Sequence, residues 1–282
     1  MKNRGKTFLI IIIVLSFLVV AFSVFLLIRK EKMYSDAREE YDGILEFTKI
    51  ELNNVTYEED KLSEGKYDSL SEDETSFMMV DEKSLISINE DYRGWIYIPA
   101  LSLSYPLVQG KDNDYYLSHT FYKERNNSGS AFLDYINAPD FSDRNTFIYA
   151  HNMRDDSMFG SLNRFKDESE LCKSNPFLYI FHNGNVYKYR IFSYYVTDTS
   201  KYYENPAEDR YRLIGRNGEE LNNPEYISYR DYVDKAIELS LFEGGDIYSY
   251  GEPDIITLST CYGAYGTDRR FIVHAFLTDD SM

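Results

Sequence analysis

Two residues with reactive side chains lie at the ends of apolar runs near the end of the chain. The β-branched run Ile255–Thr260 is followed directly by Cys261, and a second apolar run, 271–277, begins directly after Arg270. Two adjacent strands joined by a short loop would place this thiol and this guanidinium side by side at one edge of a sheet. The only other cysteine is Cys172, so neither a disulfide framework nor a four-ligand metal site is expected for Cys261.

A nucleophilic cysteine needs a partner that favours the thiolate, which is usually a histidine or another cation. The chain has four histidines: His119, His151, His182 and His274. His151 follows the predicted buried strand 145–150 at its C-terminal end, the same position that Cys261 has after its own strand. We therefore predict that His151 and Cys261 face one cleft. The other three histidines lie in a polar loop, before an Asn-Gly turn and inside the final strand.

Short strands separated by turn signals follow one another from Ser84 onward. Eight are predicted, at 94–98, 104–108, 129–134, 145–150, 177–181, 185–196, 254–259 and 271–277. The dipeptide Asn183-Gly184 predicts a type I′ hairpin between the fifth and sixth strands. Eight such strands indicate a closed or nearly closed barrel.

Helical patterns flank and interrupt these strands. Residues 31–54 have apolar residues at 3/4 spacing and are predicted to be helical, whereas 55–76 are acidic and predict a solvated linker. Residues 226–242 predict an amphipathic helix that Gly244-Gly245 would end. Its expected apolar face is formed by Tyr229, Tyr232, Val233, Ala236, Ile237, Leu239 and Leu241.

An uncharged apolar segment occupies residues 8–28. At a rise of 1.5 Å per residue it is long enough to cross the hydrocarbon core of about 30 Å. Ala21-Phe22-Ser23 resembles a signal-peptide cleavage site, but the apolar run exceeds the 7–15 residues of a typical signal core, so we predict an uncleaved anchor. Basic residues on both sides of the segment leave its orientation undecided by the positive-inside rule.

The charge of the chain is concentrated after this segment. The first 32 residues carry +5, and removing them from the total of −17 leaves −22 on the rest. So acidic a body is a poor ligand for nucleic acid or anionic lipid, and we place it outside the cell. The His, Cys and Asp residues show no metal-ligand spacing, so no metal or cofactor is expected, although the acidic loops leave an incidental calcium site open.

Five segments together form a recognisable pattern. They are Leu258-Ser259-Thr260-Cys261 with the downstream Arg270, Tyr149-Ala150-His151-Asn152-Met153, Gly94–Pro99, Tyr105–Gln109 and Gly129–Asp134. In order and spacing they resemble the sortases, membrane-anchored cysteine transpeptidases that join surface proteins to the cell wall of Gram-positive bacteria. Ala150 departs from the glycine that usually precedes the histidine. The resemblance spans residues 80–278.

The resemblance implies a mainly β fold, an eight-stranded sortase-type β-barrel with an N-terminal helical extension. A long helix inserted before the cysteine strand, as here, is characteristic of class B. The expected organisation is a cytoplasmic N-terminus at 1–7, a transmembrane signal anchor at 8–28, a helical extension and acidic linker at 29–83, and a catalytic domain at 84–282. The protein would then be a single-pass protein of the cell membrane with an extracellular catalytic domain.

The resemblance also implies a role for each reactive residue. Cys261 would attack a peptide carbonyl to form a thioacyl enzyme, and His151 would be the cationic partner of the thiolate and the acid for the leaving amine. Arg270 would donate to the developing oxyanion. Arg269 is a competitor, but alternation turns the two arginines to opposite faces unless a bulge intervenes. Cys172 follows an acidic stretch and is predicted to be a bystander.

Ser259 lies two residues before the nucleophile and shares its sheet face, so we expect it, with Tyr149 and Thr260, to contact substrate. The expected partners are surface proteins with a C-terminal sorting motif, cleaved after threonine, and an amine of the peptidoglycan cross-bridge or precursor, or of a pilin. Two alternatives remain: a cysteine peptidase that hydrolyses its substrate, and a non-catalytic anchored binding domain.

Overall fold

The computed structural model describes residues 2–52, 76–198, 213–214, 226–263 and 267–278. The chain divides into two compact units, Met1–Gly43 and Ile44–Met282. The predicted acidic linker lies outside the described residues except for Ser76, as does most of the segment 199–225.

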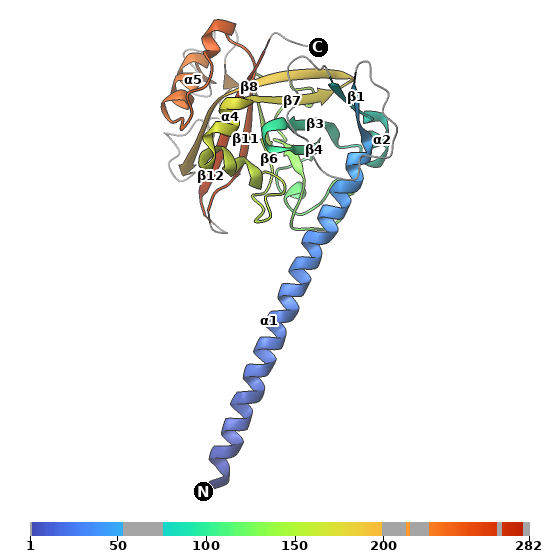
Figure 1. The fold of residues 1–282 in the computed structure, drawn as a ribbon, viewed down its shortest axis with the longest axis vertical. Coiled ribbons are helices and arrows are strands. Elements are labelled where there is room, and N and C mark those ends of the chain that lie inside the picture. Colours follow the sequence, from blue (N-terminus) through green and yellow to red (C-terminus); the bar gives the residue numbers. More distant parts are fainter. Residues whose placement is uncertain (1, 53–75, 199–212, 215–225, 264–266, 279–282) are drawn as a thin grey trace. The chain divides into compact units, whose positions relative to one another are not determined.

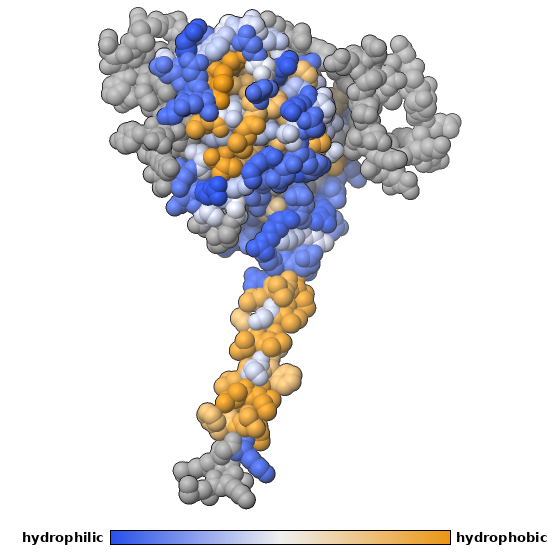
Figure 2. Space-filling model, turned by 60° about the vertical axis from the view of Figure 1, so that its left-hand side comes forward, coloured by the Kyte–Doolittle hydropathy of each residue, from blue (hydrophilic) through white to orange (hydrophobic). Residues whose placement is uncertain are grey.

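The first helix, α1, runs from Lys2 to Ile44 and contains the predicted anchor (Figure 1). The segment Phe8–Phe47 includes a stretch of mean hydropathy 3.3, which by length and composition is sufficient to cross a membrane. Figure 2 shows apolar side chains along the visible face of this helix, and those from Phe8 to Ile28 are exposed. Such a surface is compatible with a membrane anchor.

The helix predicted for 31–54 ends earlier than expected. After α1, the 3-10 helix η1 spans Leu45–Phe47, and the strand β1 spans Thr48–Leu52. β1 pairs antiparallel with β2, Ser76–Val80. The prediction was wrong here because β1 alternates apolar and charged residues, and its partner begins only 24 residues after its end.

All eight predicted barrel strands are confirmed, with small shifts at their ends. They are β3 (Tyr92–Ile98), β4 (Leu103–Val108), β5 (Ala131–Leu133), β6 (Asn145–Tyr149), β7 (Phe177–His182), β8 (Asn185–Asp198), β11 (Ile255–Cys261) and β12 (Arg269–Leu277). They close a mixed barrel in the order β11-β12-β8-β7-β3-β4-β5-β6. The parallel contacts β11–β6 and β4–β5 are embedded among antiparallel ones, so strands distant in sequence end side by side.

The predicted hairpin joins β7 and β8. Asn183 and Gly184 both have positive φ, +52° and +74°, as a type I′ turn requires. Glu82, in helix α2 (Glu82–Ile88), accepts hydrogen bonds from the backbone N–H groups of Asn183 and Gly184.

The single tryptophan, Trp95, is fully buried and donates to the Ser104 hydroxyl.

Short elements connect the strands. They are η3 (Pro99–Leu101), η4 (Tyr115–Leu117), η5 (Gly160–Asn163), α3 (Arg164–Asp167), α4 (Ser169–Ser174), β9 (Leu213–Ile214), β10 (Tyr226–Ile227) and η7 (Ile247–Tyr250). The two residues of β9 pair in parallel with those of β10.

The predicted insertion helix is present but shorter than expected. α5 spans Tyr229–Glu238, and the hydroxyl of Ser228 caps its N-terminus by accepting from Asp231 N–H. Tyr229, Tyr232, Val233 and Ala236 are buried in a cluster with strand residues, as predicted. Ile237, Leu239 and Leu241 were wrongly assigned to this face, because their exposed fractions are 43%, 37% and 55%.

The helix stops before Gly244 because the chain turns to run along β8. Leu241 N–H donates to the Tyr194 carbonyl, and a β-carbon at Gly244 would lie 2.4 Å from the Phe192 carbonyl oxygen. Gly244 therefore permits a close backbone approach rather than terminating the helix.

Candidate active site

Cys261 and Arg270 are the last pair of the β11–β12 ladder. Their register runs without a shift from the pair Ile255 and Phe276 to this pair. Residues directly opposite in an antiparallel pair share one face, so the thiol and the guanidinium lie on the same side of the sheet. Cys261 is exposed and Arg270 is partly buried.

The two neighbouring arginines have different surroundings. Arg270 Nη1 donates to the carbonyls of Thr267 and Arg269, at 3.1 and 3.0 Å, which anchors the guanidinium against its loop. The Arg269 guanidinium lies 4.9 Å from the centre of the Tyr262 ring, a cation–π contact. The bulge that would have exchanged their faces does not occur in the described pairing of β11 with β12.

His151 reaches the same sheet edge because β6 and β11 are parallel neighbours that end together. Their last register pair is Tyr149 and Ser259. Beyond it, Thr260 Oγ1 donates to the Ala150 carbonyl at 2.8 Å, and Asn152 Nδ2 donates to the Cys261 carbonyl at 2.8 Å. His151 thus lies between two residues that are both hydrogen-bonded to the end of the cysteine strand.

The imidazole and the backbone of His151 are both held. Nε2 lies 2.7 Å from the Leu117 carbonyl oxygen, and the His151 carbonyl accepts from Phe159 N–H at 3.0 Å. The ring is therefore fixed by a contact from η4, an element distant in sequence from the strand that carries it.

Asn152 and Asn163 are site residues that the sequence did not single out. Asn163 Nδ2 donates to Asn152 Oδ1 at 3.1 Å, which leaves Asn152 Nδ2 to face the Cys261 carbonyl. Asn152 adjoins His151, but an asparagine after a strand is a common turn residue, so its type gave no separate signal.

The three predicted substrate contacts have different positions. Ser259 and Tyr149 are register partners on the face of Cys261, and the Tyr149 hydroxyl donates to Asp134 at 2.8 Å. Thr260 is on the opposite face, only 2% exposed, and its hydroxyl is bonded to Ala150. Its position favours a part in aligning the strand ends over a contact with substrate.

His274 and Cys172 lie apart from the sheet edge that carries Cys261. Burial lowers the pKa of His274 to about 3, and its ring nitrogens contact the hydroxyls of Tyr195 and Thr257. Burial raises the pKa of the Cys172 thiol to about 12, which keeps it protonated at neutral pH. A thiol in that form is a poor nucleophile, in agreement with the bystander expected from the sequence.

A cavity of about 220 Å³ lies beside the segment that follows His151. It is lined by Leu101, Ser102, Leu103, Tyr105, Asp156, Met158, Ser161 and Arg164. None of Cys261, His151 and Arg270 lines it, so it is not the site described above.

Comparison with known protein families shows to which family the chain belongs. A family model described as the sortase domain matches residues 96–278. The chain belongs to the sortase family. Sortases are cysteine transpeptidases, and the barrel with its strand-end cysteine agrees with this membership.

Curated sortase relatives extend the match. Sortase B of Listeria monocytogenes is 37% identical over 179 residues, which are 64% of this chain and 66% of that protein. Sortase B of Staphylococcus aureus is 30% identical over 78% of this chain and 86% of its own length.

Solved class B sortases share the fold. Sortase B of Clostridium perfringens has a TM-score of 0.60 and 34% identity, covering 70% of this chain and all of the other. Sortase B of Bacillus anthracis, in complex with AAEK1, has a TM-score of 0.62 and 30% identity, covering 88% and 98%. The eight-stranded barrel predicted from the sequence is therefore that of a class B-like sortase.

Proposed function

We propose that this chain is a membrane-anchored transpeptidase that cleaves the C-terminal sorting signal of surface proteins after threonine. The acyl group would pass to an amine of the peptidoglycan cross-bridge or precursor, or of a pilin lysine. The anchor would be residues 8–28, with the barrel outside the cell. The observation that carries the proposal is the convergence of Cys261, Arg270 and His151 at one end of three adjacent strands.

The chemistry assigns one task to each residue. The Cys261 thiolate attacks the carbonyl carbon of the threonine, and Arg270 donates to the oxyanion that forms. His151 gives its proton to the departing amine as the C–N bond breaks, which leaves a thioester on Cys261. The incoming amine then attacks the thioester, loses a proton to His151, and releases the thiolate.

The hydrogen bonds of Arg270 hold its guanidinium in place for donation to the oxyanion. Its guanidinium is a planar fork with five N–H donors, and Nη1 is anchored on the carbonyls of Thr267 and Arg269. Anchoring restricts the rotation of a side chain that would otherwise lose entropy when it binds an oxyanion. Ser259 and Tyr149, on the same face, would line the groove for the peptide.

A transfer assay tests the proposal. Full-length protein in detergent is incubated with a library of sorting peptides, with and without an added amine such as triglycine, and the products are read by mass spectrometry. The proposal expects the amine-linked product to replace the hydrolysed one as the amine concentration rises. Hydrolysis that no amine concentration diverts would favour a peptidase, and no cleavage of any peptide would favour a binding domain.

A further inference from the structure

The loop between β4 and β5, which contains η4, holds His151 in one orientation. A carbonyl oxygen can only accept a hydrogen bond, so the 2.7 Å contact between His151 Nε2 and the Leu117 carbonyl requires a proton on Nε2. In the neutral ring the other nitrogen, Nδ1, is then the one without a proton. The Leu117 carbonyl thereby selects the nitrogen that is able to exchange a proton with the thiol or the amine.

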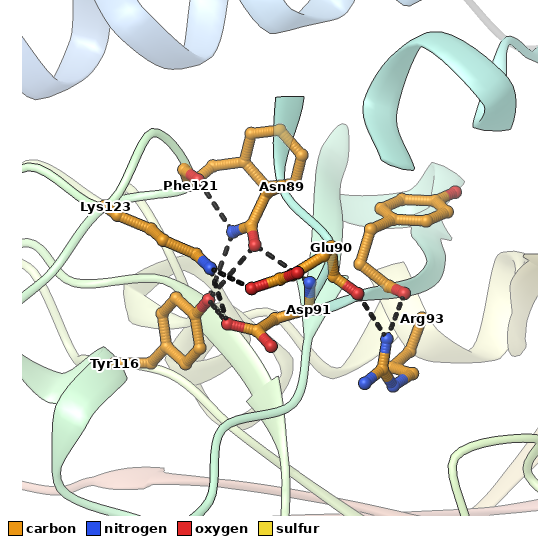
Figure 3. Close-up of polar contacts among 8 residues, drawn as sticks. Asn89, Glu90, Asp91, Arg93, Tyr116, Phe121 and Lys123 are labelled. Carbon is orange, nitrogen blue, oxygen red and sulfur yellow. Dashed lines mark hydrogen bonds and ion pairs between the residues drawn. The ribbon is translucent and has the colours of Figure 1, made fainter. Parts of the chain in front are cut away.

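Tyr116, the residue before Leu117, anchors the Leu117 carbonyl. Tyr116 is fully buried, and its hydroxyl donates to Asp91 Oδ2 at 2.7 Å and accepts from Asn89 Nδ2 at 3.1 Å (Figure 3). Lys123 Nζ lies 3.0 Å from the same Asp91 oxygen, and Asn89 also donates to the Phe121 carbonyl. The segment from η4 to Lys123 is thus tied to the turn between α2 and β3.

The charge state of Asp91 supports this anchor. Burial alone would raise the pKa of Asp91, but hydrogen bonds from Tyr116 and Lys123 together lower it below its usual range. The carboxylate is therefore ionised at neutral pH, and hydrogen bonds to an ionised acceptor are the stronger ones. Tyr116 contributes one of these bonds through a hydroxyl on a rigid ring.

Gly129 closes the other side of the same turn. It has φ of +58°, and a β-carbon there would lie 2.4 Å from the Tyr116 carbonyl oxygen and 3.2 Å from His151 Cδ2. The Tyr116 carbonyl also accepts from Ser130 N–H at 3.0 Å. Gly129 therefore leaves no space for a side chain between the Tyr116 carbonyl and the imidazole of His151.

We infer that Tyr116 and Gly129 are positioning residues that, through the Leu117 carbonyl, hold His151 as the Nε2–H tautomer with Nδ1 toward the reacting groups. This inference rests on the proposed function, since it specifies which nitrogen of His151 performs the proton transfer. Neither residue touches the substrate in this account; both act through the orientation of the imidazole.

The direct test is the tautomer itself. Full-length protein labelled with ¹⁵N-histidine is studied by NMR in detergent without substrate at neutral pH, and His151 is assigned from the signal lost in His151→Gln. The Nε2–H form is expected in the wild-type protein. An Nδ1–H form, or a rapidly averaged mixture of both, would overturn the inference. Because no substrate is present, this result is independent of whether the proposed activity is found.

Matched substitutions test the anchor by kinetics. Tyr116→Phe removes one hydroxyl and should lower kcat by about 3- to 10-fold, with KM changed less than about twofold. The control is Tyr194→Phe, which removes a buried hydroxyl bonded to the Phe165 carbonyl and should leave kcat near wild type. Equal kcat in both variants, or a fall in kcat for Tyr116→Phe with an unchanged His151 tautomer population, would contradict the positioning role.

Gly129→Ala is the more severe change. It adds a β-carbon against Tyr116 and His151 and should lower kcat on the order of 100-fold, because a misplaced catalytic group is costly. Gly184→Ala has the same positive-φ strain with open space around the β-carbon, and should keep wild-type kcat. Equal kcat in the two variants would contradict the inference. Should Gly129→Ala not fold, the wild-type tautomer and Tyr116→Phe still decide the question.

Discussion

The side chain of Asn152 donates a hydrogen bond of 2.8 Å to the carbonyl oxygen of Cys261. It joins the residue after the predicted acid–base histidine to the backbone of the predicted nucleophile. Asn163 fixes the direction of this amide by donating to its oxygen. The Asn152 side chain therefore joins the C-terminal ends of β6 and β11 beyond their last register pair.

Asn152→Ala should lower kcat by about 2- to 10-fold, the usual worth of one hydrogen bond, with little change in KM. Asn152→Asp should be worse, because a carboxylate oxygen would face the Cys261 carbonyl. Steady-state kinetics on one sorting peptide measures both. Asn185→Ala, in the exposed β7–β8 hairpin, is the control and should match wild type. Wild-type kcat in both Asn152 variants would remove this residue from the account.

Arg270→Ala should lower kcat and kcat/KM together by about 100- to 1000-fold, because the oxyanion contact is made chiefly in the transition state. Arg270→Lys should restore part of the loss, since an ammonium keeps the charge but lacks the planar fork. Arg269→Ala should be close to neutral, because that side chain packs on Tyr262. A large loss for Arg269→Ala with a mild one for Arg270→Ala would reverse the assignment.

The sequence predicted the barrel well because its strands carry local signals. β-branched runs end at Cys261 and near His151, and Asn183-Gly184 marks its turn by φ preference. The sequence interpretation missed β1 because the helical spacing of residues 31–47 was extended across it, although β1 itself alternates apolar and charged residues. Nor could it predict the Leu117 contact, since a backbone carbonyl has no side-chain signature and its position depends on tertiary packing.

Stability should depend on pH through His274. Its pKa of about 3 in the folded protein is below the unfolded value of about 6.5, so below pH 6.5 the unfolded chain binds a proton that the folded chain does not. The free energy of unfolding should therefore decrease as the pH is lowered from about 6.5 to about 3, by up to ~1.4 kcal/mol per pH unit. Above pH 6.5 this group contributes no pH dependence.

The free energy of unfolding at pH 5 and 7, followed by the fluorescence of the buried Trp95, measures this effect. His274→Gln should reduce the difference between the two pH values by about 2 kcal/mol, even if it lowers stability at both. His182→Gln, a partly buried histidine in the hairpin, is the control. An unchanged pH dependence in His274→Gln would show that His274 is not buried in its neutral form.

The apolar segment 8–28 should remain on the mature protein, because its length fits a spanning helix better than a cleaved signal. Intact-mass measurement of protein from the membrane fraction should give the full chain from the N-terminus through this segment. A mature chain that begins at Val24 would show that the segment is a cleaved signal.

The most direct measurement of the central claim is the position of the acyl group during turnover. Full-length protein, Cys261→Ala and Cys172→Ala are each mixed with a sorting peptide, quenched in acid, digested and mapped by mass spectrometry. The account predicts a thioester on Cys261 in the wild-type protein and in Cys172→Ala, which removes a buried thiol. Cys261→Ala should show neither adduct nor turnover. An adduct on Cys172, or cleavage that persists in Cys261→Ala, would contradict the account.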